Sequence, residues 1–339
     1  MADSSWTPLH ARLHRTLRSR HLLEPNQHLL VAVSGGQDSL CLIKLLLDLQ
    51  PLWQWQIGIA HCDHRWRPDS EANANYVEQL AKTWETSFHC YTAQQPLKSE
   101  AAARQWRYQA LSAIAHEFGY NCIVTGHTAS DRAETLLYNL IRGSGADGLQ
   151  ALTWIRLLSS RLVLVRPLLE VTRNETAQFC QDMHLVVWED SSNQDLKYAR
   201  NRIRQELLPY LQTHFNARVE HALAQTSELL QAEVEYLELT ATQVLLRARG
   251  EKDVESDFSL PLKINRSVLQ TAPLALQRRV IRQILQQTVA TSSPSFEQIE
   301  KIQALITAPN RSQTDPLPGG AIAVVDGDWI WLKMRQETS

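Results

Sequence analysis

Residues 34–39 read Ser-Gly-Gly-Gln-Asp-Ser and directly follow an apolar run that begins at Leu29. The two glycines can expose their backbone N–H groups and the two serines add hydroxyl donors, so this loop is suited to hold a pyrophosphate group. It is not a Walker A loop, because it lacks the Gly-Lys-Ser/Thr ending of that motif. Asp38 would repel a phosphate unless a cation lies between them, which predicts Mg²⁺ at this carboxylate. The alternative is a plain strand-to-helix turn in which Asp38 or Ser39 caps the helix.

Asp131 and Glu134 lie three residues apart in a helical pattern, so they share one face of a helix. A pair of carboxylates at the mouth of a crevice could hold an ammonium group. One of them could also remove its proton, because only the neutral amine is a nucleophile. Acidic residues are equally common in the first turn of a solvated helix, where they favour the helix dipole. His127, just after an apolar run, could contact a phosphate or merely cap the same helix.

Arg104 and Arg107 also lie three residues apart, in an alanine-rich helical pattern. Two guanidinium groups on one face suit the charge of an α-phosphate or of a departing pyrophosphate. The competing interpretation is a surface salt bridge to Glu100 or another neighbour. We favour the functional interpretation.

These residues need a scaffold that brings them together, and residues 27–188 have the pattern of one. Short apolar runs predict strands at 29–33, 56–62, 87–91, 122–125 and 162–166, with a weaker candidate at 185–188. Helical patterns alternate with them at 38–49, 70–84, 99–118, 131–141 and 172–183. This alternation predicts an α/β domain with a doubly wound parallel sheet, whose ligands bind at the carboxyl ends of the strands. The loop at 34–39 and the polar residues 61–64 and 126–127 all follow strands, so they should converge on one crevice.

The pattern changes after about residue 215. One long helical pattern (216–246) and a polar linker (250–257) precede an extended piece (258–264), two helices (275–287 and 295–307) and a strand pair (321–325 and 329–334). Asp326-Gly327, between the last two strands, is a hairpin signal. We therefore predict a catalytic domain at residues 1–215 and a smaller, mostly helical α+β accessory domain at residues 216–339.

Composition is that of an ordinary globular protein. Lys and Arg total 34 against 36 Asp and Glu, a net charge of −2, so the chain carries no global basic charge that would indicate nucleic-acid binding. The five cysteines are scattered and form no Cys-x-x-Cys pair, which favours a reduced, cytoplasmic protein without a zinc or cluster site. The start of the chain lacks the apolar core of a signal peptide, and no apolar run approaches the ~20 residues that span a bilayer. We expect no membrane association.

The string at residues 34–39 resembles the signature of the PP-loop ATP pyrophosphatases, which cleave ATP to AMP and pyrophosphate and adenylate a substrate. Further stretches resemble one branch of that superfamily, the tRNA(Ile)-lysidine synthetases, in order and spacing. They are 61-HCDHRWRPDS-70, 100-EAAARQWRY-108, 125-TGHTASDRAET-135, 142-RGSGADGL-149, 166-RPLL-169 and 189-EDSSNQDLKYARNRIR-204. The resemblance covers residues 28–211 and implies a PP-loop, Rossmann-like fold.

The resemblance also implies a reaction. ATP adenylates the wobble cytidine of a tRNA(Ile) with a CAU anticodon at its C2 oxygen, and free lysine then displaces AMP to give lysidine. The implied ATP site is Ser34, Gly35, Gly36, Gln37, Asp38, Ser39 and His127, with Mg²⁺ at Asp38. The implied lysine site is Asp131 and Glu134, and these two carboxylates act in catalysis with Asp38, Arg104 and Arg107. Where the family usually carries a second His and a Gln, this chain has Thr128 and Arg132, so the roles of those two positions do not carry over.

A locally basic segment carries the predicted contacts with tRNA. Residues 190–193 precede a helix with Lys197, Arg200, Asn201 and Arg204, and Arg142 with its following glycines resembles a second anion-binding turn. The alternatives are a solvated helix face and a helix C-cap with its glycine stop. Weaker candidates are the N-terminal helix, with Arg12, Arg15, Arg18 and Arg20, and the cluster Arg278, Arg279 and Arg282, of which we favour the cluster.

Three other functions fit parts of the pattern. A PP-loop tRNA 2-thiolase would use the same activation, but such enzymes generally need a catalytic cysteine pair or a cluster site. An amidating synthetase that uses ammonia would normally bring a glutaminase domain or a reactive N-terminal cysteine. A binding module with an inactive loop is disfavoured by the intact loop and both carboxylates. The sequence leaves a homodimer open.

Overall fold

The computed structural model describes residues 6–65, 69–95, 99–188, 195–250, 259–288 and 294–335 of the 339-residue chain. The chain divides into two compact units, Met1–Gln231 (unit 1) and Ala232–Ser339 (unit 2). The division falls inside the long helix α10 (Val219–Arg249), further along the chain than the predicted boundary at residue 215. Within the described ranges, no helix is both long and apolar enough to cross a bilayer.

Unit 1 is built on a six-stranded sheet with the strand order β3-β2-β1-β4-β6-β5. Its strands are β1 (His28–Ala32), β2 (Gln56–Asp63), β3 (Ser87–Thr92), β4 (Cys122–Thr125), β5 (Ile155–Ser159) and β6 (Leu162–Val165). All neighbouring strands are parallel except β5 and β6, which are antiparallel. The five principal predicted strands are confirmed, each to within one residue at either end.

Two details of the predicted sheet are wrong. The missed strand β5 is an edge strand, and its apolar residues Ile155 and Leu157 are exposed, so no alternation with a buried face marks it. Residues 185–188 are not a strand. Leu185 and Val187 pack against the hydrophobic core without sheet pairing, and the N–H of Trp188 donates to the carbonyl of Gly35 at 3.0 Å.

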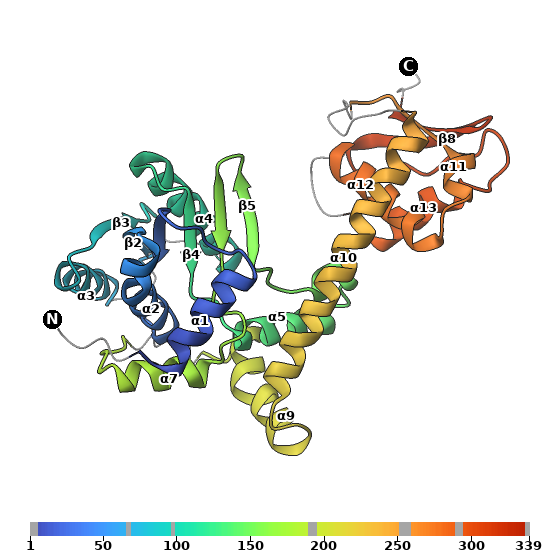
Figure 1. Ribbon diagram of the computed structural model, residues 1–339. Helices are drawn as coiled ribbons and strands as arrows, with labels where there is room; N and C mark the ends of the chain where they lie inside the picture. The colour runs from blue at the N-terminus through green and yellow to red at the C-terminus, as the bar shows by residue number, and fades with distance from the viewer. Residues whose placement is uncertain are drawn as a thin grey trace. The chain divides into compact units, whose positions relative to one another are not determined.

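Helices cover both faces of this sheet, as predicted for a doubly wound fold. On one face the core includes side chains of α1 (Pro8–Ser19), α2 (Gln37–Trp53), α3 (Ser70–Thr83) and α7 (Arg173–Asp182), and on the other face α4 (Glu100–Phe118) packs. Figure 1 shows α1, α2 and α7 on the same side of the strands. The remaining helical elements of unit 1 are α5 (Ala129–Ile141), α6 (Ala146–Leu149), α8 (Ala199–Arg202), the π-helical turn η2 (Ile203–Leu207), α9 (Leu208–His214) and the first part of α10.

The position of β1 determines where the crevice lies. Leu30 of β1 pairs with Gly58 of β2 on one side and with Ile123 of β4 on the other. The strand order therefore reverses at β1: α2, which leads from β1 to β2, and α4, which leads from β3 to β4, cover opposite faces of the sheet. Such a switch point opens a ligand crevice at the carboxyl ends of the strands.

A polar network joins the first turns of α10 to α5 inside unit 1. The carboxylate of Glu228 on α10 accepts hydrogen bonds from Arg20 (2.6 Å), Arg132 (2.8 Å) and the indole N–H of Trp154 (2.7 Å). Arg132 on α5 is only 1% exposed. The hydroxyl of Ser130, also on α5, donates to Glu220 of α10 at 2.6 Å. Arg132, which replaces the Gln usual in the family, is therefore a buried anchor for α10.

Unit 2 is a smaller α+β body. Its antiparallel sheet has the order β7-β9-β8. The elements are β7 (Leu262–Asn265), α11 (Arg266–Gln270), α12 (Leu274–Thr288), α13 (Phe296–Ala304), the short 3₁₀ turn η3 (Pro318–Gly320), β8 (Ala321–Asp326) and β9 (Trp329–Met334). The predicted hairpin is confirmed, with Asp326 paired to Trp329 across a turn in which Gly327 has φ +57°. Most of the predicted linker, residues 251–257, and residue 258 of the extended piece lie outside the described residues.

The core of unit 1 leads to a first prediction. Leu30 is fully buried between the central strands and α4, so Leu30→Ala should lower the free energy of unfolding of unit 1 by about 2–5 kcal/mol, because it removes apolar contacts and leaves a cavity. Urea unfolding followed by tryptophan fluorescence measures this, since most tryptophans lie in unit 1. Leu52→Ala, at a 62% exposed position of α2, is the control and should change the midpoint little. Equal effects of the two substitutions would contradict the assignment of the core.

Candidate active site

A crevice of about 750 Å³ lies at the carboxyl ends of β1, β2 and β4. The three polar clusters expected to converge do so here. The lining includes Ser34, Gly36, Gln37, Asp38, Ser39, His61, Asp63, His64, Gly126, His127 and Asp131, together with Arg107, Arg173, Trp188 and Arg204. Among the predicted site residues, Gly35, Arg104, Glu134, Arg142, Lys197, Arg200 and Asn201 are not part of this lining.

Hydrogen bonds within the glycine loop fix its shape. The Ser39 hydroxyl donates to the carbonyl of Gly36 at 2.8 Å and accepts from the N–H of Ser34 at 3.1 Å. The N-cap of α2 is Gly36, so the alternative in which Asp38 or Ser39 caps the helix is wrong. Gly35 has φ +87°, and a Cβ there would lie 2.6 Å from the side-chain oxygen of Asn73. The first glycine is therefore required both for its backbone conformation and for space.

The loop after β4 approaches the glycine loop closely. A Cβ on Gly126 would lie 2.8 Å from the backbone carbonyl oxygen of Asp38, so only glycine allows this contact. Next to it, His127 forms a hydrogen bond with the Thr125 hydroxyl at 2.9 Å. Burial, and more weakly the neighbouring arginines, lower the pKa of His127 to about 3, so its ring is neutral at pH 7. It can contact a nucleotide as a neutral donor or acceptor.

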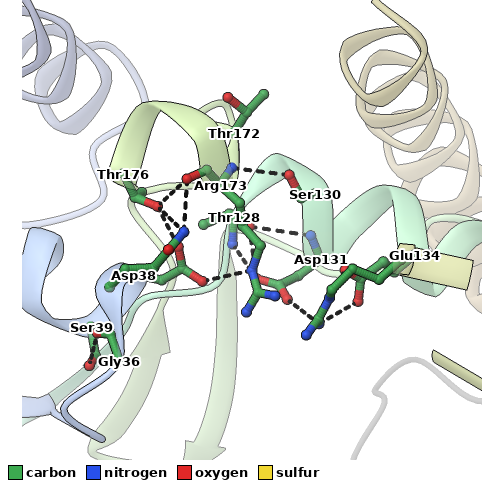
Figure 2. Close-up of polar contacts among 12 residues, drawn as sticks. Gly36, Asp38, Ser39, Thr128, Ser130, Asp131, Glu134, Thr172, Arg173 and Thr176 are labelled. Atoms are coloured by element: carbon green, nitrogen blue, oxygen red, sulfur yellow. Dashed lines mark hydrogen bonds and ion pairs between the residues drawn. The ribbon is translucent and has the colours of Figure 1, made fainter. Parts of the chain in front are cut away.

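Asp38 lies on the first turn of α2 and is buried. One carboxylate oxygen accepts a hydrogen bond from the guanidinium of Arg173 at 2.9 Å, and the other accepts from the hydroxyl of Thr176 at 2.5 Å (Figure 2). Burial raises the pKa of Asp38, although Arg173 opposes this shift. The side-chain amide of Gln37 donates to the carbonyl of Arg173 at 2.8 Å, so it is engaged within the protein.

Asp131 has a structural role as well as a place in the crevice. One of its oxygens accepts from both the N–H and the hydroxyl of Thr128, each at 2.8 Å, which completes a capping box at the start of α5. Thr128, where the family usually has a second His, is thus a helix cap. The alternative interpretation, an acidic residue that stabilises the first turn of a helix, is confirmed for this oxygen. The first turn of α5 is buried, however, and not solvated as that alternative assumed. Burial alone would raise the pKa of Asp131, but the charge of Arg173 and the hydrogen bonds from Thr128 lower it.

Glu134 lies one turn further along α5 and is 2% exposed. Both of its oxygens accept from the guanidinium of Arg204, at 2.6 and 2.8 Å. The same guanidinium lies 3.8 Å from Asp131. Arg204 is on the π-helical turn η2, a geometry often found at functional sites. Burial raises the pKa of Glu134, and Arg204 opposes the shift.

The charges of this cluster do not cancel. Asp38, Asp131 and Glu134 supply three carboxylates, whereas Arg173 and Arg204 supply two guanidinium groups. Figure 2 shows Arg173 between Asp38 and the start of α5. When every group is ionised, the cluster carries one negative charge in a largely buried place. Such a site favours one additional cation.

A second cluster, of opposite sign, surrounds Tyr108 on α4. The guanidinium carbons of Arg104 and Arg156 lie 5.4 and 5.5 Å from the centre of its ring. Burial and the neighbouring arginines lower the pKa of Arg104, and in the described parts of the chain no ion pair joins Arg104 or Arg107 to an acid. Arg107 instead contacts the His64 ring at 3.0 Å. The side chain of Glu100, which the salt-bridge alternative named, lies outside the described residues, so that alternative stays untested for it. The arrangement of the described residues favours an anion.

The residues predicted to contact tRNA are divided between two places. Arg142 and Arg200 both lie over the ring of Tyr138, at 5.2 and 5.8 Å, and Lys197 is exposed. Arg142 is also the C-cap of α5, followed by Gly143 at φ +76°, as the alternative interpretation expected. Asn201 is buried, and its amide donates to the carbonyl of Asp195 at 2.9 Å. Arg204 is in the crevice, as described above, and residues 190–193 lie outside the described residues.

Arg173 is a site residue that the sequence reasoning missed. It is the first residue of α7, which follows β6. Burial lowers the pKa of its guanidinium, but the nearby carboxylates of Asp131, Asp38 and Glu134 outweigh this and raise the pKa. The only signal was its position: it begins the helix after a predicted strand, directly beyond 166-RPLL-169. Trp188 was also missed, because its segment had been interpreted as a strand.

A magnesium ion can be tested against these donors. No group of three or more His, Cys, Asp or Glu side chains within the described residues could hold a metal ion. Asp38 is the acid of the glycine loop that lines the crevice. Mg²⁺ is often bound by one or two carboxylates together with nucleotide phosphates, so the donor set fits an ion that arrives with ATP, provided Asp38 releases Arg173.

Comparisons with known proteins agree with this geometry. A PP-loop domain family model matches residues 7–211, and a TilS substrate binding domain model matches residues 265–330. The tRNA(Ile)-lysidine synthase of Nostoc sp. is 67% identical over 98% of this chain and 99% of its own length, and that of Synechocystis sp. is 51% identical over 96% and 98%.

A solved structure shows the same fold. The U34-tRNA thiolase NcsA from Methanococcus maripaludis has a TM-score of 0.56 at 13% identity, covering 66% of this chain and 78% of its own. At that identity the likeness concerns the fold alone. By the family models and by the extent of its identity with these relatives, the chain belongs to the tRNA(Ile)-lysidine synthase family.

Proposed function

We propose that this chain ligates lysine to C2 of the wobble cytidine in a tRNA(Ile) with a CAU anticodon. In the first step the C2 oxygen of cytidine attacks the α-phosphorus of ATP, and pyrophosphate leaves. In the second step the lysine amine attacks C2, and AMP leaves. One observation carries the proposal: a single crevice is lined both by the glycine loop and by Asp38 and Asp131 of a carboxylate cluster that has one more acid than arginines.

For the first step, the glycine loop and His127 would bind ATP. Asp38 would hold Mg²⁺ together with the phosphates, and the ion would supply positive charge to the departing pyrophosphate. Arg104 and Arg107 on α4 would stabilise negative charge that develops on the phosphates, because among the described residues no ion pair joins them to an acid.

For the second step, the lysine ammonium would enter the cluster formed by Asp131 and Glu134. The pKa shifts suggest how the two carboxylates divide the work. Burial raises the pKa of Glu134, which makes it the stronger base, whereas the pKa of Asp131 is lowered and it stays ionised as a counter-ion. Arg204 would leave Glu134 when the substrate cation arrives.

The thiolation alternative is not favoured. Cys41, Cys122 and Cys180 are buried in the core on one face of the sheet, and burial raises the pKa of Cys122 to about 12, so its thiolate is scarce. All five cysteines are free thiols. A cytoplasmic location and a homodimer remain predictions.

The overall proposal is tested by incubating the chain with ATP, lysine and tRNA(Ile) bearing a CAU anticodon, followed by mass analysis of the nucleosides. We expect lysidine, with AMP formation that depends on tRNA. A 2-thiolated nucleoside, or AMP formation that needs neither tRNA nor lysine, would contradict the proposal.

Glu134→Gln separates the two steps. Pyrophosphate release with ATP and tRNA should continue, while transfer of lysine should fall by about 30- to 1,000-fold, because a buried charge partner worth about 2–4 kcal/mol is lost. The two partial reactions are measured separately, and Glu117→Gln, at an exposed position on α4, is the control. Loss of adenylation in parallel with transfer would argue against a lysine-specific role.

Asp38→Asn tests the first step. We expect pyrophosphate release to fall at least about 100-fold, the range seen when one charge-stabilising group is removed, and the Mg²⁺-dependent part of ATP affinity to disappear. Titration calorimetry with and without Mg²⁺ measures the affinity directly. Asp182→Asn, at an exposed position of α7, is the control. An unchanged yield of lysidine would overturn the metal assignment.

A further inference from the structure

The arginine cluster on α12, favoured from the sequence as a tRNA path, is largely paired within unit 2. Arg278 pairs with Glu300 at 2.7 Å. Arg279 and Arg282 both pair with Glu238 of α10. Two carboxylates thus offset two of the three positive charges, so this cluster attracts a polyanion less than three unpaired arginines would.

The three-stranded sheet of unit 2 has one face in the core and one face directed away from it. Alternate residues of the strands are buried against the helices, among them Leu262, Ile264, Ala323, Val325, Ile330 and Leu332. The residues between them alternate to the opposite face. On that face, Lys263 of β7 is directly opposite Trp331 of β9, and Trp331 is in turn opposite Val324 of β8.

This outer face combines exposed cations with indole rings. The ammonium of Lys263 lies 4.5 Å from the ring centre of Trp329 and 5.8 Å from that of Trp331. Lys333 is the next residue of β9 in the same alternation, and Arg335 follows the end of the strand. Both are exposed. We call Lys263, Trp329, Trp331, Lys333 and Arg335 the tryptophan face.

The charges of the tryptophan face are not balanced by acids. Among the residues that the structure describes, no ion pair involves Lys263, Lys333 or Arg335, in contrast to the arginines of α12. Asp326, at the hairpin end of β8, is an acid on the same side of the sheet. Three cations against one carboxylate leave a net positive charge beside two half-buried aromatic rings.

We propose that the tryptophan face is an RNA-binding surface that contacts the tRNA substrate, with the cations on phosphates and an indole stacked on a base or ribose. This rests on the proposed function, which makes tRNA the substrate. RNA is the partner with matching chemistry, because it offers anionic phosphates and flat bases side by side. An apolar protein partner would instead have to desolvate Lys263 without replacing its hydration.

Two variants test the surface by direct binding of tRNA, without ATP or lysine. Trp331→Ala should weaken tRNA binding about tenfold, in the range of one lost base–aromatic stack, and Trp331→Phe should retain most of the affinity. Lys263→Gln should weaken binding and reduce the slope of log affinity against log salt by about one. In turnover, KM for tRNA should rise while kcat at saturating tRNA stays unchanged, since the crevice is untouched.

Lys301→Gln is the matched control, because Lys301 is a cation on α13 of the same unit but is paired with Glu297 at 2.9 Å. Its affinity and salt slope should equal those of the parent chain. Cross-strand tryptophans also contribute to the stability of a sheet. Urea unfolding of each variant therefore distinguishes a lost contact with tRNA from an unfolded sheet.

Parent-like affinity and salt slope in folded Trp331→Ala and Lys263→Gln would overturn the surface, even if the parent chain makes lysidine. A parent chain that binds tRNA through these residues but makes no lysidine would instead overturn the proposed function and leave the surface intact.

Discussion

The central constraint of this structure is the balance between three buried carboxylates and two guanidinium groups at one edge of a sheet. Asp38 shares Arg173 with the start of α5, and Glu134 is held at both oxygens by Arg204. A buried carboxylate is costly unless it is paired, so neither arginine can leave without a replacement of the same charge. The cluster thus couples the two halves of the proposed chemistry: the loop that would bind ATP and the helix that would bind lysine are linked through Arg173.

The fold supplies this coupling through the order of its strands. Because β1 and β4 are neighbours, the glycine loop and the start of α5 emerge next to each other, and Gly126 lets their backbones nearly touch. α7 returns beside α2 and brings Arg173 to Asp38, although the two residues are 135 positions apart in the chain. The distribution of charge follows from topology: acids gather on the α5 side of the crevice, and the arginines Arg104 and Arg156 lie over the ring of Tyr108 on α4.

Much of this could be predicted from the sequence, and what could not has physical causes. The spacing of apolar residues indicated the five parallel strands, and the turn residues Asp326-Gly327 indicated the hairpin. Both signals come from residues that are close together in the sequence. The edge strand β5 was missed since its apolar residues Ile155 and Leu157 are exposed. Residues 185–188 have the apolar pattern of a strand, but Leu185 and Val187 pack against the core without pairing in the sheet. The glycine loop and the carboxylates Asp131 and Glu134 were recognised from their residue types and spacing. Their partners were not, because the pairings of Arg173 with Asp38 and of Arg204 with Glu134 join positions far apart, and no local pattern encodes them.

The buried anchor between α5 and α10 bears on how this protein can be cut into working parts. A fragment ending at residue 215 would lack Glu228, and the buried guanidinium of Arg132 would lose the carboxylate with which it pairs at 2.8 Å. Trp154 and Arg20 would lose the same acceptor. An autonomous catalytic fragment must therefore extend at least to Gln231, through three turns of a helix that sequence composition alone would assign to the other half of the molecule.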